Sequence, residues 1–195
     1  ATYMDGTTDI TRTYPLGELT EDEKRFYTWT LQSHIDLAKA VWLDYCECKM
    51  IDTIAREPLW RHLINYRCGT GHSVSFVGNV HEGPHALNSR NTTRMRPGMV
   101  VTDEPGVYET DLVGIRIENE LVCIHKADNQ YGTFLGFEPL TFVPIATSPI
   151  LPGVLDKDEL AWLNDYHRQV FAKLAPHLNA EERVWLAEKC ASIGC

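Results

Sequence analysis

Four side chains of the types that bind metal ions lie at separate points of the sequence, each in a distinctive local setting. His72 lies among glycines, Glu104 follows a run of valine and threonine, and Glu118 follows two isoleucines in alternation. Asp9 comes shortly after an Asp-Gly pair, which is typical of a hairpin turn. Carboxylates with one imidazole suit Mn²⁺, Co²⁺ or Fe²⁺ better than a metal that prefers thiolates. Together, these residues predict a metal site.

The chemistry that such a site predicts is hydrolysis. Carboxylates can bridge two cations, and a two-metal site turns a shared water into a nucleophile near neutral pH. His81, in the segment NVHEGP, could stabilise a developing oxyanion or transfer a proton. The predicted reaction is attack on a polarised carbonyl, and hence cleavage of an amide bond.

Taken one at a time, the same residues have ordinary structural explanations. A lone histidine in a strand is usually hydrogen-bonded packing, and a glutamate after an apolar run usually ends a strand in solvent. Arg116 precedes Glu118 by two residues on the same strand face, and such a pair on a surface contributes little to stability. Only the combination favours a functional site.

The elements that must position these residues follow from hydrophobic spacing. Helical spacing predicts helices over 20–44 and 48–64, the first with a capping box at Thr20 and Glu23. Turn residues then divide the middle of the chain into strands, and two helices end it. The predicted strands are 73–80, 98–103, 112–125 and 133–143, and the later helices run from 155 to Pro176 and over 180–191. Strands followed by helices predict an α+β fold.

Composition excludes several classes of protein. The 195 residues carry 18 Lys and Arg against 27 Asp and Glu, a net charge of −9, which makes nucleic acid a poor partner. No apolar run approaches the roughly 20 residues that cross a bilayer. Six cysteines without a C-x-x-C pair predict reduced thiols in a cytoplasmic protein.

Four ordered blocks resemble the long, eukaryotic-like form of aminopeptidase P, a branch of the M24 pita-bread metallopeptidases. The blocks are DGTTDITRTY (5–14), GTGHSVSFVGNVHEGP (69–84), MVVTDEPGVYE (99–109) and GIRIENELV (114–122), and the tail with FLGFEPLTFVPI (134–145) and WLNDYH (162–167) resembles the end of that form. The resemblance implies a creatinase- or methionine aminopeptidase-like pita-bread fold that is N-terminally incomplete. Residues 1–147 would be the C-terminal portion of the catalytic domain, and residues 148–195 a C-terminal helical extension.

The resemblance also implies a set of metal ligands. Asp9 and Glu118 match carboxylates that bridge two ions, usually manganese, while His72 and Glu104 match terminal ligands of one of them. Glu104 would act as general base when the bridging hydroxide attacks the carbonyl carbon. The family's first metal aspartate falls before Ala1, so we expect at most one tightly bound ion and weak or no activity from this chain alone.

Residues around the metals follow the family pattern less closely. His81 matches a histidine that contacts the substrate and stabilises the transition state, and Arg116 would orient a neighbouring carboxylate. Cys68 stands where the family usually places a pocket histidine, and a thiol is a weak hydrogen-bond donor. Ser73 and Ser75 replace glycines of the family pattern, which predicts crowding of a close backbone approach.

The resemblance therefore implies a metal-dependent Xaa-Pro aminopeptidase, which removes an N-terminal residue that precedes proline. Its expected partners are peptides with proline at the second position, the missing N-terminal segment and, as a candidate assembly, a second copy in a homodimer. Two alternatives remain: a non-catalytic pita-bread module that binds proteins, and a prolidase- or creatinase-like hydrolase that differs in its pocket.

Overall fold

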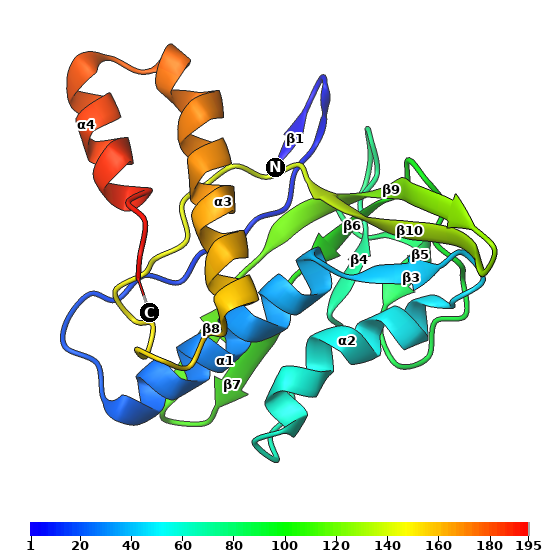
Figure 1. The fold of residues 1–195 in the computed structure, drawn as a ribbon, viewed down its shortest axis with the longest axis horizontal. Coiled ribbons are helices and arrows are strands. Elements are labelled where there is room, and N and C mark those ends of the chain that lie inside the picture. Colours follow the sequence, from blue (N-terminus) through cyan, green and yellow to red (C-terminus); the bar gives the residue numbers. More distant parts are fainter. Residues whose placement is uncertain (195) are drawn as a thin grey trace.

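The structure is a computed structural model that describes residues 1–194 of the chain. Its helices are α1 (Glu21–Ala38), α2 (Cys48–Trp60), α3 (Lys157–Leu174) and α4 (Ala180–Lys189), with a short 3-10 turn η1 (Ala175–His177). Its strands are β1 (Thr2–Tyr3), β2 (Gly6–Thr7), β3 (Val41–Leu43), β4 (Gly71–Ser73), β5 (Glu82–Leu87), β6 (Val100–Asp103), β7 (Gly106–Glu109), β8 (Val113–Arg116), β9 (Asn119–Asn129) and β10 (Gly132–Pro139). This mixture of helix and antiparallel sheet confirms the predicted α+β class (Figure 1).

One sheet of six antiparallel strands, in the order β3-β10-β9-β6-β4-β5, dominates the fold. In the pairing of β6 with β9, Val101 lies opposite Leu121 and Thr102 lies opposite Glu120. Because side chains alternate along a strand, the first pair faces one side of the sheet and the second pair the other. Val101 and Leu121 are buried in a core, so the opposite face is left to polar residues.

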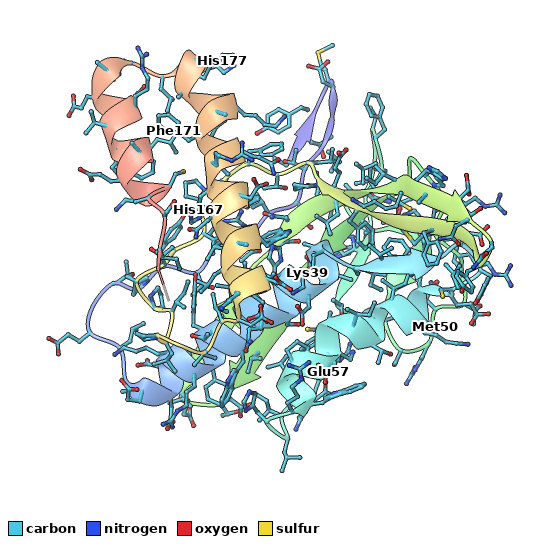
Figure 2. All side chains as sticks on the ribbon, viewed as in Figure 1. Lys39, Met50, Glu57, His167, Phe171 and His177 are labelled. Carbon is cyan, nitrogen blue, oxygen red and sulfur yellow. The ribbon has the colours of Figure 1, made fainter. Side chains whose placement is uncertain are left out.

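Helices α1 and α2 cover the apolar face of the sheet (Figure 1). Leu37 of α1 and Ile51 and Ala55 of α2 pack in one core cluster with Leu121 and other strand residues. Met50 lies on α2 away from this core and is half exposed (Figure 2). Apolar burial on one helix face is what the spacing of the helical segments predicts.

A second core joins α3 to α1 and to the small two-stranded sheet of β7 and β8. Leu31 of α1, Ile115 of β8 and Leu163 of α3 are buried together in it, and Leu186 of α4 adds to its edge. Helix α4 runs back alongside α3 (Figure 1). The C-terminal helices are therefore packed on the body of the fold through α3.

Some predicted boundaries are wrong. The helix predicted over 20–44 ends at Ala38, because the next residues turn out of it and pair as β3 with β10. The segment predicted as a strand over 73–80 is mostly irregular, while the real strand β5 follows it. Strand β5 contains Gly83 and Pro84, which read as a turn in sequence. The strand predicted over 112–125 is divided into β8 and β9.

Two further findings concern the whole described chain. Five cysteines lie within residues 1–194, and all are free thiols: Cys46, Cys48, Cys68, Cys123 and Cys190. No helix of this part of the chain has the length and apolar character needed to span a membrane.

Candidate active site

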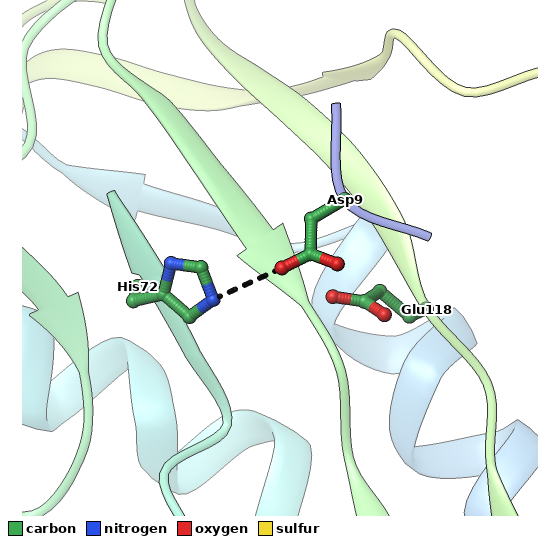
Figure 3. A group of neighbouring side chains, drawn as sticks. All are labelled: Asp9, His72 and Glu118. Carbon is green, nitrogen blue, oxygen red and sulfur yellow. Dashed lines mark ion pairs between the residues drawn. The ribbon is translucent and has the colours of Figure 1, made fainter. Parts of the chain in front are cut away.

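Three of the four predicted metal ligands converge on the polar side of the sheet. One ligand atom from each of Asp9, His72 and Glu118 lies within 4.8 Å of the other two (Figure 3). The three residues come from separate segments, namely the loop after β2, strand β4 and the residue before β9. His72 and Glu118 therefore point into the same space, which a shared metal site requires.

His72 presents Nε2 to the carboxylates. Its Nδ1 atom lies 3.0 Å from the carbonyl oxygen of Ser73, which can only accept, so Nδ1 carries the proton in the neutral ring. Nε2 lies 3.5 Å from Asp9 Oδ2 and 3.1 Å from Glu104 Oε1. Despite these approaches, this buried nitrogen makes no hydrogen bond of suitable geometry within residues 1–194. A lone pair held in this way is available to a cation.

Burial and neighbouring charges shift the pKa values of two of the predicted ligands. The pKa of Glu118 is raised to about 7, mainly by burial. A hydrogen bond from Thr11 opposes this rise, and the negative charges of Glu104 and Asp9 add to it. Glu118 is 1% exposed, and its Oε1 has no hydrogen-bond partner among the described residues. Burial lowers the pKa of His72, but contacts led by the one with Glu104 outweigh it and raise the pKa overall. Neighbouring carboxylates contribute to both shifts, and a bound cation would oppose them.

The segment that carries Asp9 is held against the strand by hydrogen bonds. Thr11 Oγ1 donates to Glu118 Oε2 at 2.5 Å, and the Glu118 N–H donates to the Thr11 carbonyl oxygen at 3.0 Å. The N–H of Asp9 donates to Glu120 Oε1 at 2.8 Å. Sequence reasoning missed these roles of Thr11 and Glu120. The available signal was that Glu120 shares a strand face with Glu118.

Glu104, the fourth predicted ligand, lies beside this group. Its Oε2 lies 2.8 Å from Arg116 Nη1, and its Oε1 accepts a hydrogen bond from Thr102 Oγ1 at 2.9 Å. Burial raises the pKa of Glu104, but the contacts with His72, Arg116 and Thr102 outweigh it and lower the pKa overall. The carboxylate that Arg116 orients is thus Glu104.

His81 and Cys68 each contact one member of the site. The exposed ring of His81 lies against the ring of His72, with 4.0 Å between the centroids and 56° between the planes. The Cys68 thiol lies 3.8 Å from the carbonyl oxygen of Gly106 and 3.8 Å from Arg116 Nη2. The thiol therefore lies next to the guanidinium that holds Glu104.

The close backbone approach in this region is at Gly71. A Cβ atom at Gly71 would lie 1.8 Å from the carbonyl oxygen of Thr102, so only glycine fits there. This approach lets the N–H of His72 donate to Thr102 Oγ1 at 3.0 Å. Ser73 and Ser75, at which crowding was predicted, are both buried in the structure.

Comparisons with known proteins agree along the whole chain. Residues 1–125 match metallopeptidase family M24, and residues 133–193 match the C-terminal region of peptidase M24. Aminopeptidase P1 of Lotus japonicus is 42% identical over 200 residues, which cover 100% of this chain and 30% of that protein. Aminopeptidase P2 of Arabidopsis thaliana is 44% identical over 193 residues, which cover 95% of this chain and 27% of that protein. The chain spans less than a third of the length of these relatives.

Solved structures show the same relationship. The fold is similar to that of X-prolyl aminopeptidase from Caenorhabditis elegans, described as a cytosolic enzyme with a di-nuclear active site. The TM-score is 0.93 at 38% identity, and the match covers 98% of this chain and 32% of the other. Prolidase from Pyrococcus furiosus is less similar, with a TM-score of 0.61 at 28% identity over 72% of this chain and 39% of the other.

Proposed function

Because the chain belongs to metallopeptidase family M24, we propose that it acts in a metal-dependent aminopeptidase that releases an N-terminal residue preceding proline. Its α+β pita-bread fold, expected from the sequence, is confirmed by the match to the nematode enzyme. The observation that carries the proposal is the convergence of Asp9, His72 and Glu118, because two of their buried ligand atoms make no hydrogen bond within residues 1–194.

The donors present fit a divalent transition ion, and we favour Mn²⁺. Asp9 and Glu118 offer hard carboxylate oxygens, and His72 offers a neutral imidazole nitrogen whose other nitrogen is already hydrogen-bonded. Glu104 lies close enough to His72 to join them once its contacts rearrange. When bound, such ions supply a nucleophilic water near neutral pH and polarise the scissile carbonyl. We infer two ions in the full-length protein.

The side chains around the donors have separate tasks in this proposal. Glu104, kept ionised by Arg116 and Thr102, accepts a proton from the attacking water. His81, exposed beside His72, donates a hydrogen bond to the developing oxyanion. A proline at the second position presents no N–H, so the pocket must fit its ring instead of binding a donor.

The two alternative functions have less support. A non-catalytic binding module has no need of buried, unpartnered ligand atoms, which cost free energy when they are left unsatisfied. A prolidase-like activity is supported by the same fold, but the likeness to the X-prolyl aminopeptidase extends over nearly the whole chain and includes the C-terminal helices.

We also propose the partners and location that this activity implies. Substrates are peptides with proline at the second position, and the rest of the substrate pocket comes from an N-terminal segment of the same protein. A homodimer is the proposed assembly. A cytoplasmic location agrees with the free thiols and with the cytosolic nematode relative.

Peptide cleavage by the full-length protein tests this proposal. With Mn²⁺, it should release the first residue from a peptide with proline second, and Glu104→Ala and His81→Ala should each lower the rate about 100-fold or more. His125→Ala is the matched control, because His125 is an exposed histidine on the far part of β9. Full activity in the Glu104 or His81 variant would remove the proposed roles.

A further inference from the structure

We propose that a chain of polar side chains, buried except for the half-buried Arg12, positions the metal ligands; it runs from Asp103 through His34, Asn119 and Arg12 to Tyr166. We call it the polar chain. It rests on the proposed metal site and adds positioning residues from α1 and from the C-terminal helix α3. Asp103 and Asn119 are adjacent in sequence to the predicted ligands Glu104 and Glu118, and Arg12 lies three residues after Asp9.

The polar chain begins at the contact between α1 and strand β6. His34 Nδ1 lies 3.1 Å from Asp103 Oδ2 and 3.2 Å from the Asp103 carbonyl oxygen. Both side chains are 0% exposed. Asp103 immediately precedes Glu104, so the place of His34 on α1 fixes the end of the strand from which Glu104 projects.

The second step links His34 to the strand that carries Glu118. Asn119 Nδ2 lies 3.3 Å from His34 Nε2, and the side chain of Asn119 is fully buried. An amide nitrogen only donates, so Nε2 accepts and Nδ1 of His34 carries the proton, which it donates to the Asp103 carbonyl oxygen. Asn119 follows Glu118 directly, and the ring of His34 therefore contacts the sequence neighbours of two predicted metal ligands, Glu104 and Glu118.

The third step reaches the C-terminal helix through Arg12. Its Nη2 donates to Asn119 Oδ1 at 2.6 Å and to Tyr166 Oη at 2.9 Å, and its Nη1 donates to the Glu118 carbonyl oxygen at 2.5 Å. Arg12 follows Thr11, which holds the Glu118 carboxylate. The same guanidinium therefore ties the Asp9 segment, the Glu118 strand and helix α3 together.

Tyr166 closes the polar chain. Its hydroxyl accepts from Arg12 and from the Val143 N–H at 3.2 Å, and it is 3.0 Å from the Val143 carbonyl oxygen, to which it can donate. Tyr166 is 1% exposed, so water cannot replace a lost hydroxyl. Its ring stacks on Trp162 at a centroid distance of 5.3 Å, which a phenylalanine would retain. Removing the hydroxyl therefore takes one acceptor away from Arg12, whose guanidinium also donates to the carbonyl oxygens of Val143 and Pro144, without emptying the core.

The test compares Tyr166→Phe with Tyr27→Phe in the full-length protein. Tyr27 is the matched control, because it is also buried in the second core and its hydroxyl donates to the Ala146 carbonyl oxygen and, among the described residues, to no member of the polar chain. We measure Mn²⁺ affinity by titration and thermal stability without the ion. Both variants should lose similar stability, whereas only Tyr166→Phe should weaken Mn²⁺ binding, by about tenfold.

If Tyr166→Phe folds poorly, His34→Gln provides a second test. His34→Gln retains a group that reaches Asn119 and loses the one that faces Asp103, and it should weaken Mn²⁺ binding to a similar degree. Equal Mn²⁺ affinity of wild type, Tyr166→Phe and His34→Gln would overturn the inference alone. A wild type that binds no Mn²⁺ would overturn the proposed metal site, and the polar chain would lose its role with it.

Discussion

At the level of one residue, the surroundings of Glu118 support the proposed cation site. One of its oxygens is held by Thr11, and the other lies buried without a hydrogen-bond partner among the described residues. Such an arrangement is costly for an isolated carboxylate, and burial accordingly raises the pKa of Glu118 to about 7. In the proposed site, a bound metal ion would offset the free energy lost to this burial.

His167, away from the metal ligands, gives the chain a defined acid sensitivity. It is 1% exposed, and its Nε2 accepts a hydrogen bond from the Ile145 N–H at 3.1 Å. Burial lowers the pKa of His167 to about 4, from 6.5. The unfolded chain therefore takes up a proton before the folded one, and stability is lost as the pH falls from 6.5 to 4. The loss should reach on the order of 3 kcal/mol.

Unfolding by urea at several pH values checks this prediction. His167→Gln should be less stable than wild type at pH 7.5 and should lose less stability between pH 6.5 and 4. His177→Gln is the control, because His177 is exposed at the far end of α3 while His167 lies along it (Figure 2). Identical pH profiles for wild type and His167→Gln would show that another group causes the acid sensitivity.

At the level of elements, the sequence pattern predicted the helices, because a helix depends on interactions between residues close in sequence. Capping residues and apolar spacing located α1 and α3, because caps and helix faces depend on residues three or four apart. Strand β3 was missed because it forms by pairing with β10, which lies far along the chain. In that pairing Val41 is opposite Gly136, more than 90 residues later. The roles of Glu120 and Tyr166 were missed for the same reason, since both depend on contacts between distant segments. The metal ligands came from ordered blocks of residues, and their convergence required the folded chain.

The N-terminus of α3 should be important for stability because α3 joins the C-terminal region to the fold. Asp156 Oδ1 accepts from the N–H groups of Asp158 and Glu159, each at 2.8 Å, and the Asp156 N–H donates to Glu159 Oε2 at 2.7 Å. Asp156→Ala should cost about 1 kcal/mol in free energy of unfolding, and Asp156→Asn much less.

In α4, Asn179→Ala removes an equivalent cap. Because Leu186 is the buried residue of α4, this change should loosen α4 with little effect on the main unfolding transition. Equal losses for Asp156→Ala and Asn179→Ala in urea unfolding would contradict this difference.

At the scale of the whole molecule, the proposed metal ligands lie where its parts meet. Glu118 lies between β8, which belongs to the small sheet and the second core, and β9, which belongs to the large sheet and the first core. Asp9 comes from the N-terminal loop and His72 from near the edge of the large sheet. Because these three residues come from different parts of the fold, the geometry of the site depends on how those parts pack together.

The arrangement of these residues leads to a prediction of how many ions the chain binds. The described residues bring together Asp9, His72 and Glu118, with Glu104 beside them, which is nearly one coordination shell when water completes it. A second ion would share only the carboxylates of Asp9 and Glu118, and two shared ligands cannot hold a divalent transition ion as well as a fuller set. Titration of the 195-residue chain with Mn²⁺ should therefore give one tight site, lost in His72→Ala, while the full-length protein should give two. Circular dichroism of the titrated samples controls for folding. Two equivalent tight sites on the 195-residue chain would show that another of its side chains, with Glu120 the nearest candidate, completes the second shell.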